Sequence, residues 1–193
     1  GKLFNLRGGV ANEAVGDAVA IGQTRWATDG VPADPNAHPH VSMNREFVVV
    51  HNGIVENYLE LREELAAEGV EFASETDTEV IVQLIARFAD DGAHGDIAEA
   101  TRLAVQHLKG AHAIVVLSQR QPDRLVAVRI GNAGGVALGL GDKENYIASD
   151  IPAILEHTRR MIFLESRQMA TITADGCSVQ TLDGQPVDAE IHD

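Results

Sequence analysis

Cysteine and long apolar runs are scarce in this chain, and their scarcity limits the classes of protein to which it can belong. It has one cysteine, Cys177, in 193 residues, and no apolar run approaches the ~18 residues that a membrane-spanning helix needs. A single cysteine forms no internal disulfide, so the composition fits a reducing compartment and predicts a cytoplasmic protein with no membrane partner. The opening residues, Gly1 to Gly9, lack the apolar core of a signal peptide. A secreted scaffold held together by disulfides is therefore excluded.

Basic residues are also scarce. The chain has 15 Lys and Arg against 29 Asp and Glu, which gives a formal net charge of −14. Because nucleic-acid binding depends on clustered Lys and Arg, and the basic residues here are scattered, we expect neither DNA nor RNA as a partner. The histidines have no accompanying cluster of Cys, Asp or Glu at ligand spacing, so we expect no metal and no other cofactor.

The pattern of elements predicts one α+β domain. Strand-like segments come first, then three helical patterns, and then a series of short strands separated by Pro, Asp and Gly. This order favours two antiparallel sheets with helices packed outside them. The predicted strands are 17–23, 46–51, 111–118, 124–130, 135–140, 145–148, 160–165, 168–173 and 178–182. A short helix is expected over 151–157, and the polar tail from Gly184 is expected to fray or to lead into a further domain.

Each of the three main helices is predicted to begin with a capping box, in which a polar residue is followed three positions later by an acid. The pairs are Asn57 with Glu60, Thr76 with Glu79, and Asp96 with Glu99. Gly69 is expected to end the first helix.

A long polar segment from Gly22 to His40 lies between the first two predicted strands. It contains three prolines, which disfavour a regular helix or central strand. Its side chains suited to ligand binding are Arg25, Trp26, Thr28, Asp29, His38 and His40. A loop rich in such groups and poor in packing groups is more often functional than structural, although a solvated surface loop is the alternative.

Four motifs occur in one order: TRWAT at 24–28, NAHPH at 36–40, HNGIVEN at 51–57 and SETDTEV at 74–80. Together they resemble the glutaminase domains of the glucosamine-6-phosphate synthase family, and the segment 144–165 is also similar to that family. Such domains are class II glutamine amidotransferases of the N-terminal-nucleophile hydrolase superfamily. The resemblance implies a four-layer α/β/β/α sandwich that hydrolyses L-glutamine, with the ammonia passed to a sugar-isomerase domain that acts on fructose 6-phosphate.

Glutamine hydrolysis needs partners for both charged ends of the substrate and for the oxyanion that forms at the amide carbon. Arg25 suits the α-carboxylate, because a guanidinium binds a carboxylate through two hydrogen bonds. Asp77 suits the α-ammonium, and Asn52 with Gly53 suits the oxyanion hole. The structural alternatives are a surface ion pair for Arg25, a favourable helix-dipole position for Asp77 and a plain turn for Asn52-Gly53.

The resemblance also implies that Trp26 and Thr28 belong to a loop that covers glutamine, and that His38 shapes this loop rather than transferring protons. The alternative for Trp26 is a core aromatic residue. The remaining histidines (His94, His107, His112 and His157) are expected to be surface or structural residues.

Three departures from the family pattern bear on activity. The family's nucleophile is an N-terminal cysteine whose own α-amino group is the base, whereas this chain starts at Gly1 and Cys177 lies in a predicted turn. We therefore expect a fragment without the family's N-terminal strands, inactive alone. Gln23 and Asp29 stand where the family usually has His. Two hypotheses follow: the chain is a glutaminase domain, or it is a non-catalytic glutamine-binding module. A homodimer is a further expectation.

Overall fold

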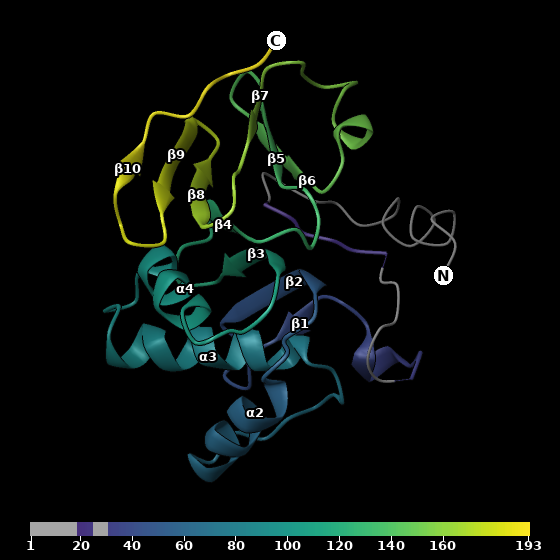
Figure 1. The fold of residues 1–193 in the computed structure, drawn as a ribbon, viewed down its shortest axis with the longest axis vertical. Coiled ribbons are helices and arrows are strands. Elements are labelled where there is room, and N and C mark those ends of the chain that lie inside the picture. Colours follow the sequence, from purple (N-terminus) through teal and green to yellow (C-terminus); the bar gives the residue numbers. More distant parts are fainter. Residues whose placement is uncertain (1–18, 25–30) are drawn as a thin grey trace.

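The structure is a computed structural model that describes residues 19–24 and 31–193, and its fold is built around two antiparallel sheets (Figure 1). The larger sheet has the strand order β1-β2-β3-β4-β8-β9-β10. Its strands are β1 (His40–Val41), β2 (Phe47–Gly53), β3 (His112–Ser118), β4 (Arg124–Ile130), β8 (Gln168–Thr173), β9 (Gly176–Thr181) and β10 (Pro186–Val187). The smaller sheet has the order β6-β5-β7, from β5 (Ala137–Leu140), β6 (Asn145–Ala148) and β7 (Met161–Phe163).

The helices lie on one face of the seven-stranded sheet, and the three-stranded sheet lies over the other (Figure 1). The helices are α2 (Tyr58–Ala67), α3 (Thr78–Asp91) and α4 (Ile97–Val105), and short 3-10 turns occur at Asp34–Asn36 (η1) and Ile151–Ala153 (η2). Alternation along β3 produces this division, since Ile114 and Val116 join the core under the helices while Ala113 joins the core between the sheets. The predicted α+β sandwich of antiparallel sheets is confirmed.

The segment that contacts the outer face of the three-stranded sheet has a different structure from the one predicted. The expected helix over 151–157 is wrong, because only η2 forms and turns follow it. Ile154 packs there against Ala137 and Met161, so the fit to the sheet determines this segment rather than helix propensity. In the described part of the chain, this face of the small sheet is therefore contacted by Ile154, which directly follows η2, and not by a helix.

The expected strand over 17–23 and the expected turn at Cys177 are wrong. Residues 19–23, the described part of that strand, form no strand, and Gln23 bonds to β2 through its side chain. Of the two expectations for the tail, fraying is wrong, because the chain turns at Gly184, where φ is +82°, and β10 then pairs with β9. That the tail leads into a further domain stays a prediction. Cys177 lies within β9 and not in a turn. No helix among the described residues is both long and apolar enough to cross a bilayer.

Candidate functional site

The site predicted at Asn52 and Gly53 lies at the end of β2, where the strand pairs with β3. Asn52 is opposite Ala113, and Gly53 is opposite His112. Gly53 has a φ of +136°, and a Cβ added there would lie 2.2 Å from the carbonyl oxygen of Ala111 and 2.8 Å from His51 Nε2. Only glycine therefore fits this position, which explains why the apolar strand ends in an Asn-Gly pair without forming a hairpin turn.

Asp77 lies beside this strand end although it is far away in sequence. It is the residue before the first turn of α3, its side chain is buried, and its Oδ2 accepts a hydrogen bond of 2.7 Å from the backbone N–H of Val55. The carboxylate is thus held at the positive end of the α3 dipole, next to the chain that leaves Gly53. The structure brings two of the three predicted substrate-binding and oxyanion elements together.

The capping box predicted for α3, Thr76 with Glu79, is wrong, because Glu79 forms other hydrogen bonds. The buried Glu79 carboxylate accepts hydrogen bonds from the N–H groups of Ala73 (2.8 Å) and Ser74 (2.7 Å). It therefore fixes the turn that leads into the helix and leaves Asp77 at its start. The Asn57 box is also wrong, because the Asn57 side chain bonds to residues 107 and 109. In the third, Asp96 does cap α4 through the N–H of Glu99 (2.8 Å).

Two buried histidines support the strand end. His51 Nδ1 lies 2.9 Å from Thr78 Oγ1, and His51 Nε2 lies 3.1 Å from His112 Nδ1. Burial lowers the pKa of His51 to about 3, with smaller contributions from neighbouring histidines, His112 first, and burial also lowers the pKa of His112. Both imidazoles are thus neutral near pH 7 and act as hydrogen-bonding partners and not as charges. The sequence placed His112 among structural residues, but it did not predict its pairing with His51.

The segment that contains His38 is attached to the chain just before α3. His40 Nε2 lies 2.9 Å from Thr76 Oγ1, and Asn36 Oδ1 accepts a hydrogen bond of 2.9 Å from the N–H of Glu75. The His38 ring lies 5.0 Å from that of His40, edge to face. The NAHPH and SETDTEV motifs therefore lie side by side. This position agrees with a role for His38 in shaping the loop, which stays a prediction.

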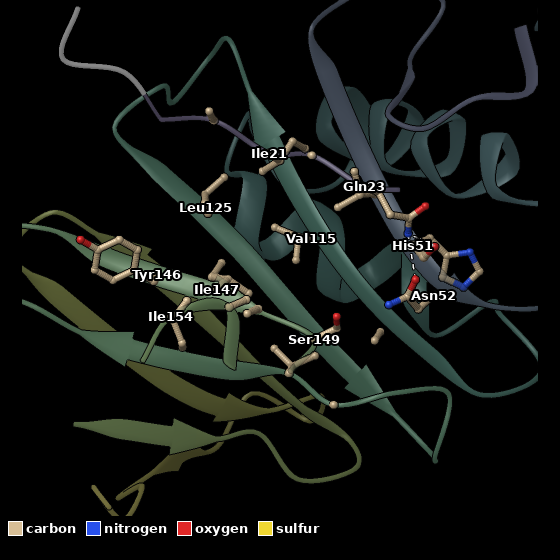
Figure 2. Close-up of a pocket in the computed structure, with 18 of the residues that line it drawn as sticks. Ile21, Gln23, His51, Asn52, Val115, Leu125, Tyr146, Ile147, Ser149 and Ile154 are labelled. Carbon is tan, nitrogen blue, oxygen red and sulfur yellow. Dashed lines mark hydrogen bonds between the residues drawn. The ribbon is translucent and has the colours of Figure 1, made fainter. Parts of the chain in front are cut away.

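Gln23 is a contact that the sequence did not predict. Its Nε2 donates to the His51 carbonyl oxygen at 2.6 Å and to Asn52 Oδ1 at 2.9 Å (Figure 2). The predicted substrate residues Arg25, Trp26 and Thr28, together with Asp29, lie outside the described residues. Their expected positions in the site stay predictions.

A cavity of about 560 Å³ lies beside Asn52, between the two sheets. Most of its lining is apolar, with Val115 and Leu125 from the large sheet and Ile147 from the small one, and residues 20–24 form part of it (Figure 2). Asn52 and His51 lie at one end, whereas Asp77 does not line the cavity. An apolar pocket with a few convergent polar groups is typical of small-molecule sites. Among residues 19–24 and 31–193, no three metal-binding side chains cluster, so the expected absence of a metal stays a prediction.

Comparison with known proteins shows the family of this chain. The model of a family described as "Glutamine amidotransferase domain" matches residues 24–156. The chain belongs to this glutamine amidotransferase family. Its relatives include the glutamine–fructose-6-phosphate aminotransferases (isomerizing) of Symbiobacterium thermophilum, 48% identical over 99% of this chain, and Aquifex aeolicus, 50% identical over 89% of it. The chain spans only 30% and 28% of the lengths of these two proteins.

Solved structures of other amidotransferases share the fold. The glutamine phosphoribosylpyrophosphate amidotransferase from B. subtilis has a TM-score of 0.67 at 23% identity and covers 83% of this chain and 34% of that one. A glutamine aminotransferase class-II domain protein from Silicibacter pomeroyi has a TM-score of 0.53 at 20% identity and covers 76% of this chain and 70% of that one. At such identities the likeness shows the fold of this amidotransferase domain, which is the fold expected from the motifs.

Proposed function

We propose that this chain is the glutamine-binding and ammonia-releasing domain of a glutamine–fructose-6-phosphate aminotransferase. The observation that carries the proposal is that Asp77 lies against the chain that leaves Asn52 and Gly53, with Asn52 lining a cavity, in a chain about half identical to enzymes of that name. In this proposal Asp77 binds the α-ammonium of L-glutamine and Arg25 binds its α-carboxylate. The Asn52 side chain and the Gly53 N–H donate to the oxyanion, and such a donor typically contributes about 10²–10³ in rate.

The remaining roles complete the proposed site. Trp26 and Thr28 cover bound glutamine, and His38 helps to shape the loop that they belong to. The names of the relatives include fructose 6-phosphate, and the chain spans less than a third of their lengths. We therefore propose that a sugar-isomerase domain uses the ammonia. A homodimer is a further proposal, which light scattering of the purified protein tests.

Ligand binding tests the central proposal. A ligand that binds only the folded state raises the melting temperature, so L-glutamine should stabilise the chain. Asp77→Asn keeps an oxygen for the Val55 N–H but removes the charge that faces the ammonium, and Arg25→Ala removes the carboxylate partner. Each substitution should weaken binding by about 10- to 100-fold, the size expected for a charged hydrogen bond. Calorimetric titration with L-glutamine measures this change.

Arg124→Ala is the matched control, because Arg124 pairs with its neighbour Asp123 at the surface. This variant should bind L-glutamine as the unaltered chain does. Unchanged binding in Asp77→Asn, or equal losses in all three variants, would contradict the proposal.

A glutamine-binding module without hydrolysis is the second candidate, and the surroundings of Cys177 indicate only that this thiol is not the nucleophile of a glutaminase. This thiol packs at the core between the sheets, and burial raises its pKa, so it is a poor nucleophile. Ammonia release separates the two candidates. L-glutamine binding without ammonia release, in a protein that joins this chain to its sugar-isomerase domain, would support the module, whereas release would support the glutaminase.

A further inference from the structure

Gln23 lies where two amide side chains and one backbone carbonyl meet. It is half-buried, and its Nε2 donates both to the His51 carbonyl oxygen and to Asn52 Oδ1. We propose that Gln23 is a positioning residue that fixes the amide of Asn52 with its Nδ2 directed away from β2 and into the cavity. This inference rests on the proposed function, because it concerns how the oxyanion donor is set.

The hydrogen bonds determine the direction of both amides. The oxygen and nitrogen of an Asn or Gln side chain have nearly the same shape, so contacts must decide which is which. The His51 carbonyl oxygen has no such ambiguity, because it can only accept. The Gln23 atom at 2.6 Å from it must therefore be the nitrogen. The Asn52 atom at 2.9 Å from that nitrogen must then be the oxygen. The Nδ2 of Asn52 is left on the opposite side.

The space on that opposite side is open to a ligand. Figure 2 shows the Asn52 oxygen turned toward Gln23 and the nitrogen turned toward the cavity. Gly134 lies next to this nitrogen, and a Cβ built on Gly134 would be 3.9 Å from Asn52 Nδ2. An oxyanion needs donors aimed at it in advance. A reversed Asn52 amide would direct an acceptor at the same point and repel the developing charge.

A purely structural role would be different in its consequences. If Gln23 only attached residues 19–24 to β2, its loss would lower stability and leave the Asn52 amide as it is. The positioning role predicts instead that the hydrogen-bonding type of residue 23 sets the direction of Asn52. Gln23→Glu tests this, because a carboxylate of the same length has no donor for the Asn52 oxygen or for the His51 carbonyl. Asn52 should therefore reverse and donate to the carboxylate.

Nuclear magnetic resonance gives a readout that needs no ligand. In the unaltered chain, we expect nuclear Overhauser contacts between the Asn52 Nδ2 protons and the Gly134 Hα protons. In Gln23→Glu these contacts should disappear. Gln106→Met is the control, because it removes another glutamine donor to a backbone carbonyl, that of Leu182, outside the site. It should leave the contacts of Asn52 unchanged.

Calorimetric titration with L-glutamine gives the functional readout. The dissociation constant should rise by about tenfold or more in Gln23→Glu, because the reversed Asn52 amide then directs its oxygen, and not its N–H group, at the ligand oxygen. It should rise only about threefold in Gln23→Met, which frees Asn52 without reversing it. Gln23→His, which keeps one N–H donor, should bind nearly as the unaltered chain does.

The two readouts separate the two proposals. Persistence of the Gly134 contacts in Gln23→Glu would overturn the positioning role, and so would a lost contact with unchanged glutamine affinity. The Gly134 contacts can also disappear in Gln23→Glu while even the unaltered chain fails to bind L-glutamine. That result would uphold the positioning role and overturn the proposed function. If Gln23→Glu does not fold, the difference between Gln23→Met and Gln23→His in affinity decides, since equal affinities would overturn the role.

Discussion

At Gly53 the backbone leaves no room for a side chain. The positive φ disfavours any L-residue, and the Ala111 carbonyl oxygen occupies the position that a Cβ would need. We expect Gly53→Ala to lower the free energy of unfolding by about 3 kcal/mol or more, because backbone strain and overlap add. Urea unfolding monitored by circular dichroism measures the loss.

Gly69→Ala is the control for this substitution. Gly69 also has a positive φ, of +96°, but nothing lies within 4 Å of the Cβ that would be added. It should lose only about 1–2 kcal/mol, the cost of the backbone conformation alone. Equal losses at the two glycines would show that the contact with Ala111 is not the cause.

Short motifs carry the single residues that were predicted for the site. Asn52, Gly53 and Asp77 were chosen from them, and the structure places Asp77 beside the chain that leaves Gly53, while their roles stay predictions. Gln23 and His51 were not, because their contacts depend on which segments become neighbours in space. A His or Gln at the end of an apolar strand has no local signal for its partner.

At the scale of elements, tertiary contacts decide how each helix begins. The predicted starts are correct to within two residues, yet only Asp96 caps its helix as expected. Asn57 instead bonds to the N–H of Lys109 and the carbonyl of His107, across the loop before β3. The spacing of capping residues predicts that a helix starts nearby. It does not predict that the capping side chain forms its hydrogen bonds with a distant segment instead.

Glu79 and Glu99 stand at similar positions in α3 and α4, but their surroundings differ. Glu79 is buried and satisfies the N–H groups of Ala73 and Ser74, while Glu99 is half-buried and pairs with Arg102. We expect Glu79→Ala to lower the free energy of unfolding by about 3 kcal/mol or more, because it leaves several buried donors unsatisfied. Urea unfolding again gives the value.

Glu99→Ala is the comparison variant. Its ion pair with Arg102, which is partly exposed, contributes about 1 kcal/mol or less, so the variant should lose much less stability than Glu79→Ala. A loss at Glu79 no greater than that at Glu99 would mean that the turn before α3 does not depend on the buried carboxylate.

At the scale of the whole molecule, the strand order was the part that the sequence could not supply. The strands at 124–130 and 168–173 were predicted with the bounds that the structure has, but nothing in either indicates that they pair. Such pairing joins segments about forty residues apart around an inserted three-stranded sheet. The order of elements along the chain predicted the class of fold. The order of strands in the large sheet depends instead on the two cores that form on the faces of β3 and β4.

The buried histidine pair links the stability of the whole fold to pH. In the unfolded chain His51 titrates near the ordinary histidine pKa of 6.5, whereas burial and the nearby His112 lower its pKa to about 3 in the folded chain. Between these values the unfolded state binds a proton that the folded state does not, so stability falls as the pH falls from about 6.5 toward 3. One such group contributes a slope of up to about 1.4 kcal/mol per pH unit.

Replacing this histidine should therefore flatten the acid limb of the stability curve. We expect His51→Asn to be less stable than the unaltered chain at pH 7, because it loses the contacts to Thr78 and His112. The difference should shrink as the pH is lowered from about 6.5 to 4, since the variant has no such group to protonate on unfolding. Urea unfolding at a series of pH values measures both slopes, and carboxylates that titrate in this range cancel in the comparison. His94→Asn, at an exposed position with a positive φ that asparagine accepts, should leave the slope unchanged. Parallel curves for His51→Asn and the unaltered chain would mean that the strand end beneath Asn52 is not held by a neutral, buried imidazole.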